Sequence, residues 1–112
     1  MYVIVFRYLV PLERIDALRE AHYTHPEGVF ARGLARLAGP LEPRTGGVVL
    51  ADGPRSAIEA AVASDPFVTS GSATAEILAF RPVWTRAENP APGTGGSAWP
   101  GGDTNGPVTP RG

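Results

Sequence analysis

The first apolar stretch of the chain, YVIVFRYLV over residues 2–10, decides its fold class. β-Branched and aromatic residues dominate this stretch and Pro11 follows it, which is typical of a β-strand. Its alternate positions are apolar on both sides, and Arg7 is its only charge. A strand that is apolar on both sides belongs to a sheet that is covered on both faces.

The stretches that follow predict two helices and three further strands. From Leu12 onward, apolar residues and both histidines recur at helical spacing as far as Gly33, a residue type that often follows a helix end. An alanine-rich helix is predicted after Pro54. Strands are predicted over three ranges, 34–41, 47–51 and 75–83. The order β-α-β-β-α-β is that of a ferredoxin-like α+β domain.

Two helices cover only one face of a four-stranded sheet, so the other face needs a second cover. We expect this cover to be another copy of the same sheet, in a homodimer whose sheets pack face to face. Arg7 is then expected to pair with an acid across the dimer, with Glu76 as the obvious candidate.

Composition separates a folded domain over residues 1–84 from a tail over residues 85–112. Pro, Gly, Thr and Asn dominate the tail, which has no apolar periodicity, so we expect it to be flexible. A domain of the remaining size buries only about 60% of its unfolded surface, which favours oligomerisation.

The residue types that are missing exclude several classes of chemistry. The chain has no cysteine, and its ten basic residues are all arginine, which excludes disulfides, thiolate zinc sites and Schiff bases. A net charge of −1 with dispersed signs argues against a nucleic-acid partner. The apolar N-terminal run is too short for a membrane span and has no basic leader, so we expect a soluble, cytoplasmic protein.

Both histidines of the chain lie in EAHYTHPEG, residues 20–28. His22 and His25 have a spacing that a helical metal site can use, but such a site needs three or four ligands. The familiar helical pair has an i, i+4 spacing and an intervening glutamate, which this stretch lacks. We therefore predict no metal.

His22 lies on the apolar stripe of its helix and is expected to point toward the sheet. A buried imidazole needs a partner for its N–H group, and Asp65 in SDPFVTSG is the natural candidate. Two alternatives stay open from the residues alone. Asp65 can be a solvated residue at a helix end, and His22 can be a structurally satisfied core histidine.

Pro26 interrupts the first helix. Its ring clashes with the carbonyl four residues earlier, that of His22, and it offers no N–H to that carbonyl. Thr24 and Glu27 have the spacing of a capping box. We expect the helix to kink or restart near Thr24, either as mere tolerance of the proline or in a way that shapes a pocket beside His22.

Three motifs together make the chain resemble the YciI-like (YCII-related) family. They are RxxH at Arg19–His22, the hairpin LARLAGPLEPRTGGVVL at 34–50, and DPFVTSG at 65–71. The resemblance covers residues 1–84 and implies a ferredoxin-like, dimeric α+β barrel. It also implies a His–Asp pair proposed as an active site, which maps onto His22 and Asp65. One activity among such relatives is cofactor-free removal of chloride from a chlorinated hydroxyquinol. The chain departs from the family pattern at His25 and Pro26.

These observations predict a small cofactor-free enzyme, of lyase or isomerase type, that moves a proton on a small cyclic or aromatic metabolite. Asp65 holds the tautomer of His22, and His22 acts as the general base. Tyr8, Tyr23 and Ser70 are candidate donors to a developing oxyanion, and Arg44 is a candidate for holding an acidic substituent; a structural or solvent-facing role is the alternative for each of the four. Other functions left open are a non-catalytic binding or accessory subunit and a cofactor-free oxygenase.

Overall fold

A four-stranded antiparallel sheet organises the first of the two units into which the chain divides, Met1–Phe80. The computed structural model describes residues 1–86. The strand order is β2-β3-β1-β4, and every neighbouring pair is antiparallel. The strands are β1 (Tyr2–Tyr8), β2 (Ala35–Pro40), β3 (Gly46–Ala51) and β4 (Ala73–Ala79). This topology confirms the predicted ferredoxin-like fold.

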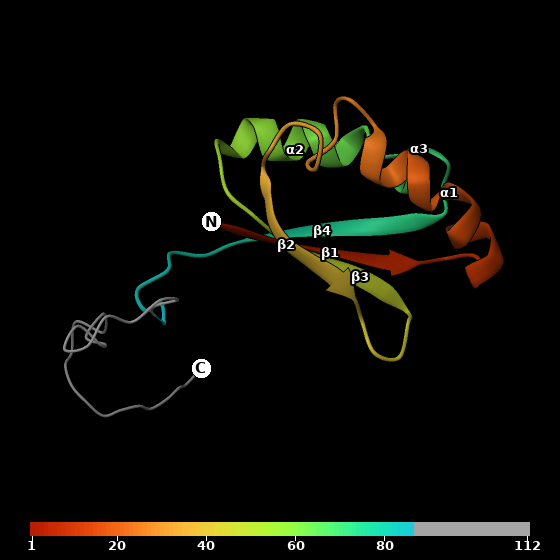
Figure 1. Cartoon of the computed structure of the whole chain (residues 1–112), viewed down its shortest axis with the longest axis horizontal. Helices are drawn as coiled ribbons and strands as arrows, with labels where there is room; N and C mark the ends of the chain where they lie inside the picture. The colour runs from red at the N-terminus through yellow and green to blue at the C-terminus, as the bar shows by residue number, and fades with distance from the viewer. Residues whose placement is uncertain (87–112) are drawn as a thin grey trace. The chain divides into compact units, whose positions relative to one another are not determined.

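The helices of this unit lie together on one face of the sheet (Figure 1). They are α1 (Leu12–Thr24), α2 (Arg55–Ala63) and the short α3 (Pro66–Thr69). The core lies between them and the sheet, because Ile4 and Phe6 of β1 point toward the helices and are almost fully buried. The other buried members of the main core cluster are Val29, Val49, Ala51, Ile58, Ala61 and Val62.

The opposite face of the sheet carries an apolar row that crosses all four strands. Leu37 of β2 pairs with Leu50 of β3, which pairs with Val3 of β1, and Val3 pairs with Leu78 of β4. Leu37 and Leu78 remain 68% and 46% exposed. In residues 1–86 no helix covers this face (Figure 1), as the sequence predicts.

The same face becomes polar toward the other end of β1. Arg7 pairs with Thr74 of β4, and Glu76 lies two pairs further along, opposite Val5. Arg7 forms no ion pair within the described part of the chain.

β1 is shorter than its predicted range, and β4 is displaced from its predicted range. β1 ends at Tyr8, two residues before the predicted end, because Tyr8 is the last residue that pairs with β4. β4 covers 73–79 rather than 75–83. Its pairing with β1 stops where β1 begins, and the last bond joins the Phe80 N–H to the Met1 carbonyl.

The expectation that the first helix kinks or restarts near Thr24 is wrong, because α1 ends at this residue. His25 follows with an extended ψ of 121°, since a residue before proline is excluded from helical geometry. The Thr24 hydroxyl donates to the Glu20 carbonyl, 2.8 Å away. The predicted capping box between Thr24 and Glu27 therefore does not start a second helix.

Residues 26–33 form a series of turns instead of a helix. These turns place Val29 in the core. Gly33 ends them with a φ of +75°, which glycine adopts without a steric penalty. Its N–H donates to Phe30, and the next N–H donates to Val29, the bonding pattern that usually closes a helix. Gly33 thus has the predicted terminating role, but it closes a turn.

None of the helices within residues 1–86 is long and apolar enough to cross a membrane. The predicted tail over 85–112 lies outside the described residues except for its first two positions. The domain boundary at residue 84 stays a prediction.

Candidate active site

His22 lies in the last turn of α1, on the side of the helix that faces the sheet. Ile15, Arg19 and His22 follow one another at spacings of four and three residues, so their side chains share one face. Ile15 and His22 are buried, which fixes this face toward the core. The C-terminal end of α1, where the negative end of the helix dipole lies, is also here.

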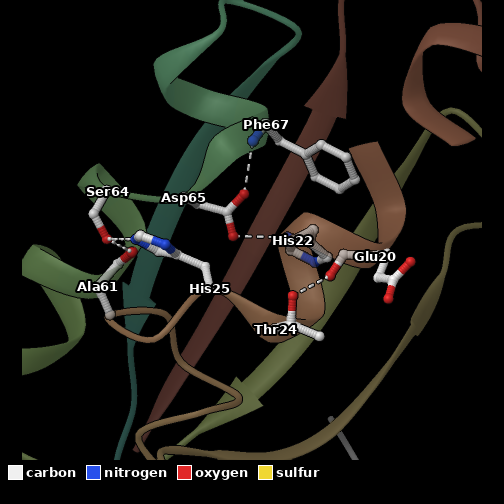
Figure 2. Close-up of polar contacts among 8 residues, drawn as sticks. All are labelled: Glu20, His22, Thr24, His25, Ala61, Ser64, Asp65 and Phe67. Atoms are coloured by element: carbon white, nitrogen blue, oxygen red, sulfur yellow. Dashed lines mark hydrogen bonds and ion pairs between the residues drawn. The ribbon is translucent and has the colours of Figure 1, made fainter. Parts of the chain in front are cut away.

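The His22 ring is bonded to Asp65, the residue that joins α2 to α3 (Figure 2). Nδ1 of His22 lies 2.7 Å from Oδ2 of Asp65, and the two side chains are only 7% and 2% exposed. Because the carboxylate can only accept, Nδ1 carries a proton, and in the neutral ring Nε2 keeps its lone pair. The ring is therefore held in a defined tautomer.

Asp65 is itself held by the backbone of α3. Its Oδ1 atom accepts a hydrogen bond of 2.8 Å from the Phe67 N–H, as the N-cap of the helix, and Pro66 occupies the first helical position. The two oxygens thus have separate partners, one on each side of the carboxylate (Figure 2). The alternative of a solvated Asp65 does not hold.

Aromatic side chains surround the His22 ring. Phe67 stacks on it with ring centroids 4.2 Å apart and an angle of 19° between the planes. Phe6, Tyr23 and Phe30 approach it edge-on at 5.0 to 5.4 Å. Phe30 comes from the turns after Pro26. Because α1 ends at Thr24, these turns can place an aromatic side chain against the His22 ring.

A cavity of about 340 Å³ opens beside this ring. This volume is within the range of small-ligand pockets. Its walls come from α1, the sheet, the β2–β3 turn, the turns after α1 and the start of α3. The lining residues are Phe6, Tyr8, Ile15, Arg19, His22, Tyr23, Phe30, Ala38, Gly39, Pro40, Arg44, Gly47, Val48, Val49 and Phe67.

Charged residues gather on the exposed part of the wall. Arg44 of the β2–β3 turn and Arg19 of α1 both donate to the carboxylate of Asp16. The hydrogen bond from Arg44 lowers the pKa of the Asp16 carboxyl and raises the pKa of Arg44. The nearby Tyr8 hydroxyl adds to the rise for Arg44.

The structure brings most of the predicted site residues together. Tyr8, Tyr23 and Arg44 line the cavity with His22, and Asp65 supports His22 from behind. Ser70 is not among the lining residues. It follows α3, and its hydroxyl lies 2.8 Å from that of Ser72.

The wall residues that sequence reasoning missed include Arg19, Phe30 and Phe67. Arg19 precedes His22 by three residues on a helix, and this spacing could have identified it. His25 does not face the cavity: its Nε2 lies 3.1 Å from the Ser64 hydroxyl. Within residues 1–86, no three His, Asp or Glu side chains gather as a metal-binding group.

The sequence matches a known domain family along nearly the whole described chain. Residues 1–81 fit the model of the YCII-related domain. The chain belongs to the YCII-related family. No curated protein matches the chain in sequence.

A solved structure of similar fold is 5-chloro-2-hydroxyhydroquinone dehydrochlorinase (TftG) from Burkholderia phenoliruptrix, in complex with 2,5-dihydroxybenzoquinone. The TM-score is 0.55 at 18% sequence identity, and the match covers 72% of this chain and 94% of that protein. At this identity the likeness concerns the fold. It agrees with the YCII-related, α+β assignment.

Proposed function

We propose that this YCII-related protein is a small enzyme that transfers a proton on a cyclic or aromatic metabolite, without a cofactor, in an elimination or isomerisation. The observation that carries the proposal is the buried bond of 2.7 Å between His22 and Asp65 beside a cavity. A buried imidazole held by a carboxylate, next to a pocket, is a general base whose reactive nitrogen has one orientation.

In the proposed mechanism, Nε2 of His22 removes a proton from an acidic C–H or a phenolic O–H group. The electron pair moves into the ring system, and either a leaving group departs with its own pair or the proton returns at another atom. Asp65 and the C-terminal end of α1 stabilise the imidazolium that forms. Positioned acid–base catalysis of this kind contributes roughly 10²–10⁴-fold.

The wall of the cavity supplies the remaining groups. We assign Tyr8 and Tyr23 as hydrogen-bond donors to the oxyanion that develops on the substrate, and Arg44 to an acidic substituent. The Ser70 assignment loses support, because this residue does not line the cavity.

The solved relative supports the choice of substrate class. Its name describes removal of chloride from a hydroxylated aromatic ring, and its ligand is a dihydroxybenzoquinone. The proposed elimination is of the same reaction type. The cytoplasmic location inferred from the sequence stays a prediction.

Proton exchange tests this function without knowledge of the natural substrate. Hydroxylated aromatics and cyclic diketones, with 5-chloro-2-hydroxyhydroquinone among them, are incubated with the protein in D₂O. Loss of C–H signals and release of chloride are followed by NMR and a chloride electrode. We expect catalysed exchange or chloride release on at least one compound.

The two histidines provide a matched comparison. His22→Gln removes the proposed base, whereas His25→Gln alters a histidine that does not face the cavity. We expect loss of at least 10²-fold of the activity in the first variant and retention in the second. Equal ligand binding by the wild type and His22→Gln, with no conversion by either, would favour the non-catalytic binding subunit. Consumption of oxygen would favour the oxygenase.

We further propose that the protein acts as a homodimer packed through the open face of the sheet. The apolar row Leu37–Leu50–Val3–Leu78 supports this arrangement, because exposed apolar surface of this extent is typical of an interface. Sedimentation analysis is expected to show a dimer for the wild type and a monomer for Leu78→Glu. Leu12→Glu is the control, since Leu12 is 40% exposed but lies at the start of α1. A monomeric wild type would contradict the dimer.

A further inference from the structure

Arg19 and Arg44 line the cavity but take no part in moving the proton. Their side chains are 58% and 32% exposed, whereas that of His22 is 7% exposed. The cavity therefore has a buried end that holds the acid–base group and an open end that holds two cations.

The guanidinium groups at the open end are already arranged around a carboxylate. Arg44 donates through both Nη atoms to the two oxygens of Asp16, and Arg19 donates to one of them from 3.2 Å. The planar fork of a guanidinium matches a carboxylate in this two-bonded geometry. Asp16 itself is not part of the cavity wall.

The net charge of this cluster and the small cost of displacing Asp16 both favour binding of a ligand carboxylate to the two arginines. Two arginines and one aspartate leave this cluster with a net charge of +1. Exposed ion pairs are worth little, so an incoming carboxylate displaces Asp16 from the arginines at small cost. The wall of the same cavity includes Tyr23 and Phe30, whose ring centroids lie 4.6 Å apart.

We infer that the cavity takes a cyclic or aromatic acid, whose ring lies near His22 and whose carboxylate binds Arg19 and Arg44 in exchange for Asp16. The volume of about 340 Å³ has room for a substituted ring, since about 150 Å³ is enough for benzene. The inference deepens the proposed function and rests on it for the role of His22.

Two compounds that share a ring test the inference by binding alone. Isothermal titration calorimetry compares 2,5-dihydroxybenzoate with hydroquinone, which lacks the carboxylate. We expect the acid to bind about tenfold more tightly, and high salt to reduce this preference.

Variants separate the roles of the three charged residues. Arg44→Gln and Arg19→Gln are each expected to weaken the binding of 2,5-dihydroxybenzoate and to leave the binding of hydroquinone unchanged. Asp16→Asn is expected to strengthen the binding of 2,5-dihydroxybenzoate, because it removes the competing carboxylate. Arg55→Gln is the control: Arg55 forms a comparable exposed ion pair with Glu59 but does not line the cavity.

Three results would each overturn the inference. They are equal affinity for the two compounds, a lack of saturable binding by either compound, and weaker binding of the acid to Asp16→Asn than to the wild type. These outcomes are independent of turnover. If the acid is preferred but proton exchange fails, the proposed function falls and the inference stands. If exchange occurs without the preference, the proposed function stands and the inference falls.

Discussion

His22 and His25, three residues apart, donate hydrogen bonds from opposite ring nitrogens. His22 donates from Nδ1 to the Asp65 carboxylate. The Ser64 hydroxyl donates to the Ala61 carbonyl from 3.0 Å, so it accepts from Nε2 of His25. The two imidazoles thus bond to consecutive residues, Ser64 and Asp65, where α2 ends (Figure 2).

Nitrogen NMR of the neutral rings is expected to find the proton on Nδ1 in His22 and on Nε2 in His25. In Asp65→Asn, the amide oxygen keeps the bond from the backbone and its NH₂ group faces His22. The proton of His22 should then move to Nε2, with the His25 signals unchanged. Ser64→Ala should alter His25 alone. The same tautomer in both rings of the wild type would contradict this assignment.

Asp65→Ala is expected to destabilise the fold far more than an exposed aspartate does. The lost N-cap costs about 1 kcal/mol, and the unpaired N–H of buried His22 costs about 1–3 kcal/mol more. Urea unfolding measures the loss. Asp52→Ala breaks an exposed pair with Arg36, and we expect a change below about 1 kcal/mol. Similar losses in the two variants would argue against a structural role for the His22–Asp65 bond.

The ion pair between Arg44 and Asp16 is expected to stabilise the protein only above acid pH. Arg44 lowers the pKa of Asp16 from its usual value of 3.8. The folded state therefore binds fewer protons, and the contribution is complete above this value and lost as the pH falls through the lowered pKa. In thermal unfolding, the wild type should be slightly more stable than Asp16→Asn at neutral pH, and this difference should disappear in strong acid. An advantage that persists in strong acid would exclude the ionised carboxylate as its source.

Gly46→Ala is expected to disrupt the contact between β3 and β1. A Cβ atom at this position would lie 1.9 Å from the Phe6 carbonyl oxygen, which is backbone and cannot move aside. We expect a loss of about 2 kcal/mol or more. Gly39→Ala on β2 is the control, since its Cβ would meet no atom within 4 Å. Equal unfolding midpoints for the two variants would contradict the close approach.

The topology could be predicted because strand signals are local. In β1, Ile4 and Phe6 meet the helices while Val3 and Val5 lie on the open face, so a run with apolar residues on both sides revealed both faces. The ends of β4 could not be predicted, because they depend on where its partner β1 begins.

The site was less accessible to sequence reasoning because it joins distant segments. Asp65 lies 43 residues from His22. The residues alone made Asp65 a candidate partner but left a solvated Asp65 open, and the family resemblance favoured the pair. The contact of Arg44 with Asp16 spans 28 residues and depends on the conformation of the β2–β3 turn. Arg19 was missed although helical spacing, which places it beside His22, could have identified it.

Burial divides the cavity into parts that evolution can change separately. His22 and Asp65 are fixed by the core, and their replacement endangers the fold, whereas the side chain of Arg19 is exposed and that of Arg44 is partly exposed. Surface substitutions usually change stability by no more than about 0.5 kcal/mol. A lineage can therefore exchange the two arginines and acquire ligands of different charge while it inherits the imidazole and its carboxylate intact.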